Sequence, residues 1–531
     1  MSRVYDVVIV GSGIAGLSCA IMLTKHGLDC AVFTKSSEVD ETATLYAQGG
    51  IIAEKSGDTP ETLAHDIWEA GCRAGRREAI ELLSREGPGL VFSFLIDEAG
   101  IAFSTDAQGN PDYTTEAAHS AARIVHYRDH TGEAVQKGLT SYAGRLGVAV
   151  HTGHTAIDLI TNNHHSRDMQ EKYRPREVMG LYVLDNSTGE VKTVLAHRVV
   201  IASGGIGNLY QHTTNPPSAT GDGISMAYRS GADVINAEYV QFHPTALYHK
   251  DIKRFLISES IRGEGARLVD HQGHAFMDAY SPLGDLAPRD VVSRAVYDRM
   301  RQQGKEYMLL DLAHTYRGSE PIEKRFSNTY ETCLEGGIDI TREPIPVVPA
   351  AHYFCGGIKS DCSGRSSLKN LYAIGEASCT GLHGANRLAS TSLLEGLLWA
   401  HLAAADIRDS FSPIDSRRLA HIPDWETPKH TVRFDPLFLQ QDFRAIQMTL
   451  WNYCGIIRTT KGLQRARADI AYYAHRILSF YHEARLNRDI IELRHGVCTA
   501  GVIVDSAIHN TASLGCHCRE ANGSRTSLYP A

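Results

Sequence analysis

The fold of this chain follows from one stretch near its N-terminus, Val7-Val8-Ile9-Val10-Gly11-Ser12-Gly13-Ile14-Ala15-Gly16. The four apolar residues predict a buried parallel strand, and the glycines mark a tight turn into the helical pattern that follows. A second apolar run, Cys30-Ala31-Val32-Phe33, comes shortly afterwards. Together these segments predict a βαβ unit of the length that a dinucleotide-binding fold needs.

The three glycines of this turn have separate expected roles. Gly11 permits the tight turn, Gly13 lets a pyrophosphate approach the backbone, and Gly16 lets the helix pack on the strand. A phosphate would then lie at the helix N-terminus, where free N–H groups and the helix dipole favour negative charge. The pattern indicates FAD or NAD, although glycine-rich turns also arise for packing reasons alone.

The composition is that of a globular protein with more than one domain. The chain has 531 residues, of which 43% are hydrophobic and 21% charged. These values predict two or three domains. The net charge is −8, from 53 basic and 61 acidic residues, and no long basic run is present. Nucleic acid is therefore not an expected partner.

Neither a membrane segment nor a metal site is expected. The apolar stretch from Tyr5 to Leu23 contains three glycines after Asp6, which favours a buried strand and helix over a signal peptide or membrane anchor. The eleven cysteines are scattered, as in a protein of the reducing cytoplasm. Cys516 and Cys518 flank His517, but no second ligand cluster accompanies them, so we expect no metal.

Two later apolar runs end in glycine and extend the predicted sheet. Val199-Val200-Ile201-Ala202 precedes Gly204-Gly205, and Leu371-Tyr372-Ala373-Ile374 precedes Gly375. Strands far apart in sequence can join one sheet, so we expect a cofactor domain of residues 1–237 and 350–412, interrupted by residues 238–349. Apolar residues at helical spacing predict a helical domain over 425–531, after a proline-containing linker at 412–431.

One position departs from the general dinucleotide fingerprint. An acidic residue is expected at the end of the second strand, where it holds ribose hydroxyls. Here the sequence is Phe33-Thr34-Lys35. The lysine could contact a phosphate or the adenine instead, or it could mark an exposed strand end.

A series of ordered motifs carries a family resemblance over nearly the whole chain. They are Tyr46-Ala47-Gln48-Gly49-Gly50-Ile51, Thr220-Gly221-Asp222-Gly223, Gln241-Phe242-His243-Pro244-Thr245, Arg262-Gly263-Glu264-Gly265-Ala266, Leu286-Ala287-Pro288-Arg289-Asp290, Pro349-Ala350-Ala351-His352-Tyr353 and Thr380-Gly381-Leu382-His383-Gly384-Ala385-Asn386-Arg387. In this order they resemble the flavoprotein family of succinate dehydrogenase, fumarate reductase and L-aspartate oxidase. That family also has a lysine after its second strand, matching Lys35.

The resemblance implies an α/β fold and FAD as the cofactor. A Rossmann-like FAD-binding domain would be interrupted by an α+β capping domain and followed by a C-terminal helical domain. Ala43 stands where membrane-complex members attach FAD to a histidine, so the cofactor should be non-covalent. The implied FAD contacts are Gly11, Ser12, Gly13, Ile14, Ala15, Gly16, Lys35, Thr42, Ala43, Thr44, Leu45, Tyr46, Ala47, Gln48, Gly49, Gly50, Asp222, Glu376, Ser392 and Leu393.

Three features favour the L-aspartate oxidase branch of this family. They are Cys355, the pair Leu382 and Ala389, and the segment from Thr115 to His126. This branch implies oxidation of L-aspartate to iminoaspartate in NAD biosynthesis, with FAD reoxidised by O2 or fumarate and a functional link to quinolinate synthase. The alternatives are a fumarate reductase or succinate dehydrogenase-like flavoprotein and an inactive FAD-binding subunit.

Substrate recognition is expected to need groups for two carboxylates and one ammonium. Family matching supplies His243, His352, Arg387, Ser258 and Gln241 for the diacid. Arginine offers a planar fork for a carboxylate, and histidine adds directional N–H bonds.

Aspartate and succinate differ by the ammonium group, and the family match points to Glu116 as its partner. The alternative is a helix-start glutamate capped by Thr114. The family's two glycines after this position are Ala117 and Ala118 here, which leaves the local backbone geometry open.

Arg289 is the expected proton-transfer residue. In this family the matching arginine protonates the substrate carbon during fumarate reduction and, by reversibility, can accept a proton during oxidation. A guanidinium is normally always protonated, so a relay must restore its proton. The alternative is an electrostatic role in which Arg289 pairs with Asp290 or Glu264.

Overall fold

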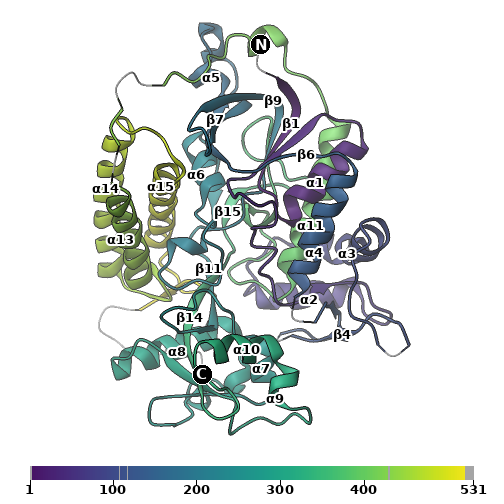
Figure 1. Ribbon diagram of the computed structural model, residues 1–531, viewed down its shortest axis with the longest axis vertical. Helices are drawn as coiled ribbons and strands as arrows, with labels where there is room; N and C mark the ends of the chain where they lie inside the picture. Colours follow the sequence, from purple (N-terminus) through teal and green to yellow (C-terminus); the bar gives the residue numbers. More distant parts are fainter. Residues whose placement is uncertain are drawn as a thin grey trace.

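A computed structural model describes residues 3–106, 108–116, 118–128, 130–427, 431–433 and 435–520. Ala117, residues 428–430 of the predicted linker and residues 521–531 of the predicted helical domain lie outside these ranges. Figure 1 shows three regions: the central sheet and its helices, a smaller region below it, and a bundle of long helices at one side.

The central sheet is built from strands spread over most of the chain. In the described ranges it has seven strands: β6 (Ala149–His151), β2 (Cys30–Phe33), β1 (Val4–Val10), β9 (Val191–Ile201), β8 (Val178–Asp185) and β7 (His154–Thr161) in that order, with β16 (Leu371–Ala373) also paired to β9. β1 lies parallel to both β2 and β9, and Leu371 of β16 is in parallel register with Val199. These pairings confirm that the predicted distant strands share one sheet.

Alternating side chains of β1 pack on opposite faces of the sheet. Val7 and Ile9 join the apolar cluster of the helices on one face, and Val8 and Val10 join the cluster on the other. This is the pattern of a parallel strand covered on both sides. The first face carries α1 (Ile14–Lys25), α2 (Pro60–Ala70), α3 (Arg77–Leu90), α4 (Thr131–Arg145) and α11 (Thr391–Asp409), together with the small sheet β3 (Ile51–Ile52), β5 (Ile124–Val125) and β4 (Tyr113–Thr114).

The lower region in Figure 1 is a second, antiparallel sheet with its own helices. Its strands run in the order β11 (Val240–Leu247), β14 (Ile345–Phe354), β13 (Met308–Asp311) and β12 (Arg267–Val269), with α7 (Glu259–Gly263), α8 (Arg289–Gln303), α9 (Ile322–Arg325) and α10 (Ser327–Glu335). The sheet β10 (Val234–Ile235), β15 (Gly357–Lys359) and β17 (Ser378–Cys379) links it to the rest. The predicted boundary between residues 349 and 350 falls inside β14, and the domain limits stay a prediction.

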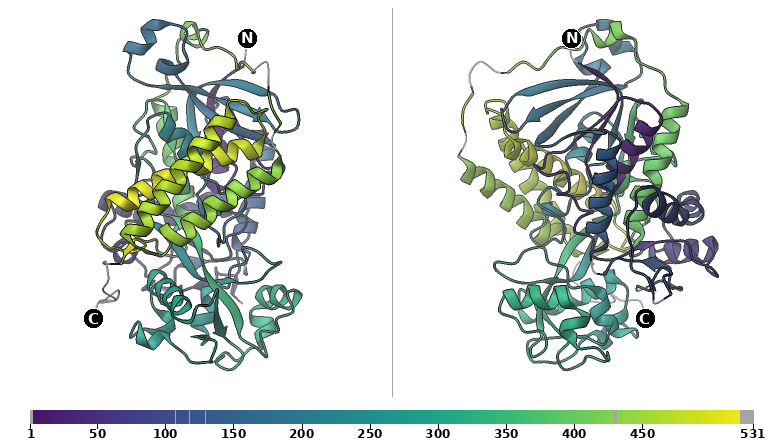
Figure 2. Two further views of the ribbon diagram at one scale, coloured as in Figure 1. Left: turned by 90° about the vertical axis from the view of Figure 1, so that its left-hand side faces the viewer. Right: turned by 45° about the vertical axis from the view of Figure 1, so that its right-hand side comes forward.

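Three long helices form the bundle, as Figure 2 shows from two sides. They are α13 (Pro436–Cys454), α14 (Thr460–Tyr481) and α15 (Arg488–His509), accompanied by the strand pair β18 (Ile457–Arg458) and β19 (Cys518–Arg519). α15 packs against α6 (Asp222–Arg229), so the bundle touches the cofactor region. The short helices α5 (Asn162–His165) and α12 (Ser416–Leu419) lie in the connections. None of the helices in the described ranges combines the length and apolar content that a bilayer crossing requires.

Candidate active site

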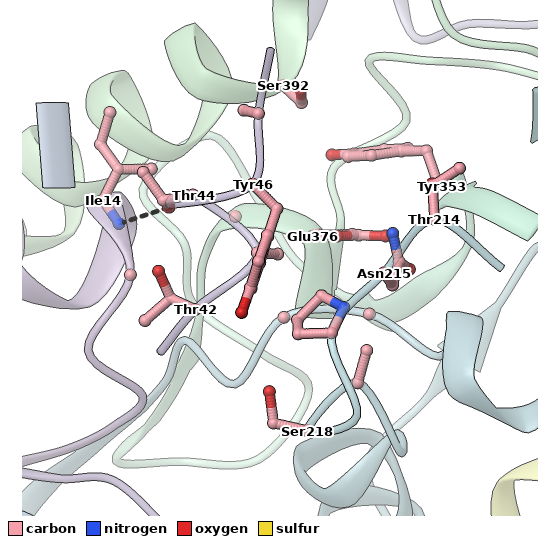
Figure 3. A pocket seen from close by; sticks show the side chains of 18 of the residues that line it. Ile14, Thr42, Thr44, Tyr46, Thr214, Asn215, Ser218, Tyr353, Glu376 and Ser392 are labelled. Atoms are coloured by element: carbon pink, nitrogen blue, oxygen red, sulfur yellow. Dashed lines mark hydrogen bonds between the residues drawn. The ribbon is translucent and has the colours of Figure 1, made fainter. Parts of the chain in front are cut away.

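One elongated cavity of about 570 Å³ runs from the glycine turn after β1 to the edge of the antiparallel sheet. Segments far apart in sequence line it, among them the turn at 11–15, the loop at 42–50, the segment 252–259 and the residues that follow β16. Figure 3 shows side chains from these segments converging on one space, with Glu376, Asn215 and Tyr353 on one side and Thr42 and Thr44 on the other. Such a cavity at the carboxyl ends of parallel strands is a typical ligand site.

The glycine turn forms one wall of the cavity. Gly11 has a φ of 112°, and a Cβ there would come 2.2 Å from the carbonyl oxygen of Ala202. Gly13 is the N-cap of α1 and provides no side-chain cap, while the backbone N–H of Ile14 donates to Thr44 Oγ1 at 3.0 Å. The glycine turn and the N-terminus of α1 therefore face the cavity, where a pyrophosphate fits.

The loop at 42–50 is held over this wall by a residue that the sequence did not single out. Gln136 of α4 donates to the backbone oxygen of Ser12 at 3.0 Å and accepts from Thr42 Oγ1 at 2.8 Å. Most of the loop lines the cavity, including Ala43, Tyr46 and Gly49.

Glu376 places a half-buried carboxyl group at the middle of the cavity. Its Oε1 accepts from the backbone N–H of Phe354 at 2.9 Å, and a Cβ on Gly205 would come within 2.2 Å of the same oxygen. Burial raises the pKa of Glu376 to about 7. A carboxyl group that faces the cavity and has few protein partners fits the hydroxyls of a ribityl chain, so the residues present fit FAD.

Two histidines lie at the far end, on neighbouring strands; His243 is buried and His352 is half-buried. The rings of His243 on β11 and His352 on β14 are 5.3 Å apart. Burial, followed by nearby arginine charges, lowers the pKa of both rings well below the ordinary value, so both are neutral at neutral pH. His243 Nδ1 accepts from the N–H of Thr245, which places the ring proton on Nε2. In the described part of the chain that Nε2 has no partner, and it can donate to a substrate carboxylate.

Arg387 is a buried cation whose side-chain partners among the described residues are neutral groups. Its Nη1 donates to Ser392 Oγ at 3.2 Å, its Nε donates to Gln241 Oε1 at 3.3 Å, and its guanidinium lies 4.6 Å from the ring centre of Tyr353. Burial and the charge of Arg289 lower the pKa of Arg387. A substrate carboxylate is the counterion that this arrangement favours.

Arg289 begins α8 and pairs with a carboxylate that the sequence analysis missed. Its Nε donates to Glu259 Oε2 at 2.7 Å, and Arg262 Nη2 lies 3.3 Å from Glu259 Oε1. Burial alone would lower the pKa of Arg289, but the charges of Glu259 and Glu116 raise it above its ordinary value. In the described residues the Nη1 of Arg289 has no partner. Arg289 and Glu259 line the cavity and Arg262 lies behind them, so the three form a continuous chain of charged groups.

The pairings considered for Arg289 at the sequence level are wrong. Asp290 pairs with Arg294 at 2.9 Å, and Glu264 pairs with Arg325 at 3.1 Å. The signal that could have indicated Glu259 is its position in the first turn of α7, capped by Ser258, three residues before Arg262.

Glu116 reaches the cavity from a loop. Thr114 ends β4 and Glu116 follows outside any helix, so the helix-cap alternative is wrong. Glu116 Oε2 accepts from Ser390 Oγ at 2.7 Å, and a Cβ on Gly49 would come 2.9 Å from Oε1. The carboxylate therefore lies between the cofactor loop and the turn after Arg387.

The Glu116 loop is fixed by a buried arginine. Arg123 is fully buried and its Nε donates to Asp58 at 2.6 Å, while its Nη1 pairs with Asp66. His119 Nε2 lies 3.1 Å from the carbonyl oxygen of Ala389. These contacts tie the loop to α2 and to the turn that follows Arg387.

Three of the predicted site residues do not line the cavity. Gly16 packs against the backbone of Gly11, where a Cβ would come 2.0 Å from the carbonyl oxygen, so its role is helix–strand packing. The backbone N–H of Leu45 donates to Thr42 Oγ1 at 3.4 Å. Gln241 lies behind Arg387 and donates to Asn386 Oδ1 at 2.7 Å. The structure brings together the other predicted residues, whose roles stay predictions.

Several further residues that the sequence did not indicate line the cavity. They include Glu259, Ser390, Tyr353, Thr214, Asn215 and Arg254. Thr214 Oγ1 lies 2.8 Å from His352 Nδ1 and so helps to set that ring. The motif around His517 gives no metal site, because its Nδ1 faces Arg458 at 2.6 Å and its Nε2 the carbonyl oxygen of Asn510. Over the ranges that the structure describes, no cluster of three acidic, histidine or cysteine side chains could hold a metal ion.

Comparison with known proteins identifies the family. Residues 6–393 match the FAD binding domain family, and residues 443–527 match the family described as fumarate reductase flavoprotein C-term. L-aspartate oxidase 1 of Ralstonia nicotianae is 41% identical over 517 residues, covering 97% of this chain and 94% of that protein. The L-aspartate oxidase of Pseudomonas aeruginosa is 40% identical, with coverage of 97% and 94%.

The chain belongs to the L-aspartate oxidase family. A solved structure of Escherichia coli quinol fumarate reductase is also similar, with a TM-score of 0.85, 26% sequence identity, and coverage of 98% of this chain and 92% of that one. Membership of the L-aspartate oxidase family confirms the predicted resemblance, the fold class and an FAD-dependent enzyme.

Proposed function

We propose that this protein oxidises L-aspartate to iminoaspartate with non-covalent FAD. FAD, when bound, supplies the acceptor for the hydride that leaves the α-carbon. The observation that carries the proposal is the convergence of Arg387, His243, Arg289 and Glu116 on one end of the cofactor cavity. Cationic and N–H groups suit two carboxylates, and the single acid suits the ammonium group.

The charges at this end match aspartate better than succinate. Arg289, Arg262 and Arg387 carry three positive charges, while Glu259 and Glu116 carry two negative ones, and both histidines are neutral. One positive charge is left, which balances the net −1 of aspartate. Succinate, with two negative charges, would leave a negative excess in a buried site, which is costly.

The protein's own groups bind, orient and exchange protons. Arg387, with Gln241 and Ser392 behind it, holds one carboxylate in a fixed plane, and His243 donates from Nε2. Arg289 holds the substrate and, when fumarate is reduced, would donate a proton to the substrate carbon; Glu259 and Arg262 lie beside it to return that proton. The neutral histidines donate hydrogen bonds without adding charge that would bind succinate more tightly.

We further propose that reduced FAD is reoxidised by O2, giving hydrogen peroxide, or by fumarate, giving succinate. Iminoaspartate would pass to quinolinate synthase in the cytoplasm, as a step of NAD biosynthesis. Fumarate shares the diacid skeleton, so its carboxylates can meet the same cations. Like succinate it carries one negative charge more than the site balances, so we expect fumarate to bind more weakly than L-aspartate.

One substrate panel tests the proposal. Purified, FAD-loaded protein is tested for peroxide formation with L-aspartate, D-aspartate, L-glutamate and succinate, and for anaerobic bleaching of the flavin by L-aspartate. We expect L-aspartate to be the preferred substrate and FAD to be released on denaturation. Turnover of succinate in preference to aspartate would favour the fumarate reductase or succinate dehydrogenase-like alternative. Absence of peroxide formation with all four compounds, together with absence of bleaching by L-aspartate, would favour an inactive FAD-binding subunit.

A further inference from the structure

The end of the cavity beyond β2 has an unusual charge arrangement. Lys35 Nζ lies 2.7 Å from Asp222 Oδ2 and 2.7 Å from Glu492 Oε1, and it donates to Thr220 Oγ1 at 2.6 Å. The lysine side chain is only 12% exposed, so it is neither a free cation nor an exposed strand end. Because two carboxylates surround one ammonium, Lys35 is not available to neutralise a pyrophosphate.

Asp222 and Glu492 place carboxylates near the end of β2, where the dinucleotide-binding fingerprint expects an acidic residue. In dinucleotide-binding folds the end of the second strand meets the ribose of the adenosine, and a carboxylate there accepts its hydroxyls. The substrate groups lie at the opposite end of the cavity, so the Lys35 end is the adenosine end. Asp222 lines the cavity, whereas Glu492 lies behind Lys35 and does not.

Glu492 comes from α15, in the helical bundle. Arg488, one turn earlier, donates from Nε to Glu492 Oε1 at 3.0 Å and from Nη1 to the backbone oxygen of Lys35 at 3.4 Å. The two α15 residues therefore hold both the side chain and the backbone of Lys35.

The same helix contacts two more backbone segments of this end. His495 Nε2 lies 3.1 Å from the carbonyl oxygen of Ala156, a residue that lines the cavity. Thr499 Oγ1 donates at 3.0 Å to the carbonyl oxygen of Gly221, which directly precedes Asp222. Thus α15 supports three separate strand or helix ends around one part of the cavity.

We propose that Glu492 is a positioning residue for the adenosine part of FAD, acting through Lys35 and Asp222, so that docking of α15 sets the affinity for the cofactor. Lys35 forms ion pairs with both Glu492 and Asp222, and replacing Glu492 by glutamine removes the negative charge of the first pair. Lys35 then pairs with Asp222 alone and draws that carboxylate away from the cavity. We expect the dissociation constant of FAD to rise at least tenfold.

The test is a titration of the cofactor-free full-length protein with FAD, followed by flavin fluorescence, in Glu492→Gln and in a matched control. Asp505→Asn is that control, because Asp505 lies on the same helix, pairs with Arg467 at 3.2 Å and is 48% exposed. The control should bind FAD within twofold of the unmodified protein. ADP, used as a competitor that lacks the flavin, should lose affinity in Glu492→Gln by the same factor as FAD.

Three results would overturn the proposal: an unchanged FAD dissociation constant, an equal rise in the control, or a rise for FAD without a rise for ADP. If Glu492→Gln does not fold, Arg488→Gln replaces it, because Arg488 is 34% exposed and its loss is milder. A two- to threefold rise is expected there, and unchanged binding overturns the proposal. No aspartate is present in these titrations, so their outcome is independent of the proposed oxidation.

Discussion

Glu116→Gln is the perturbation that most directly tests substrate recognition. The substitution keeps the shape of the side chain and an oxygen that can accept from Ser390 Oγ, now 2.7 Å from the carboxylate. It removes the negative charge that faces the cavity and that helps to raise the pKa of Arg289. Any effect on aspartate therefore reports the lost charge and not a collapsed loop.

The magnitude follows from the surroundings of Glu116. The side chain is half-buried, so a charge-assisted contact with the substrate ammonium contributes about 1.5–3 kcal/mol. Because about 1.4 kcal/mol corresponds to a factor of ten, kcat/KM for L-aspartate should fall about 10- to 150-fold. Fumarate has no ammonium group, and one less negative charge favours its binding, so kcat/KM for fumarate should stay equal or rise.

The assay compares both reactions on one preparation of each protein. Aspartate oxidation is followed by peroxide formation, and fumarate reduction by anaerobic reoxidation of chemically reduced flavin. Equal losses for aspartate and fumarate would refute the assignment of Glu116 to the ammonium group.

Three further substitutions test other parts of the site. Arg289→Gln should lower kcat for fumarate reduction about 10²- to 10⁴-fold. Titration with FAD should show an unchanged affinity for the cofactor. If the variant kept its kcat, the role of Arg289 would be electrostatic and not proton transfer. Glu376→Gln should remove a pH dependence of stability, because the pKa of Glu376 is about 7 in the folded protein and 4.5 in the unfolded chain. The cofactor-free protein should therefore lose on the order of 3 kcal/mol of unfolding free energy as pH rises from 4.5 to 7, measured by chemical denaturation. The same loss in the variant would contradict this. Ala118→Gly should stabilise the protein by about 1 kcal/mol, because Ala118 has a φ of 66°, and a lower melting temperature would show that the strain is compensated elsewhere.

The sequence predicts those parts of the fold that local patterns encode. The apolar run of β1 and the glycines after it determine the first strand and α1, and the glycine-terminated runs indicate β9 and β16. That these two runs join one sheet could be proposed because both end in glycine, whereas the register of Leu371 with Val199 comes from the structure. The partners of Lys35 could not be predicted from the sequence, since Glu492 lies more than 450 residues away and no local pattern connects the two.

Gln241 shows why motif membership does not fix the direction of a side chain. In a regular strand Gln241 and His243 would share one face, because residues two apart point the same way. The pairing of β11 with β14 shifts register between Gln241 and Phe242, and again after His243. Such a bulge re-aims neighbouring side chains. His243 therefore faces the cavity, while Gln241 turns behind it and holds Arg387.

Ala118 shows how a departure from the family pattern can leave a site intact. A left-handed alanine costs roughly 1–2 kcal/mol relative to glycine, so a free loop would relax to another backbone conformation and move Glu116. The loop is not free, because Arg123 is buried between Asp58 and Asp66 and His119 contacts the carbonyl oxygen of Ala389. Each charged contact of this kind contributes an amount similar to the strain. The anchors therefore hold the glycine-type backbone, and Glu116 keeps its hydrogen bond to Ser390.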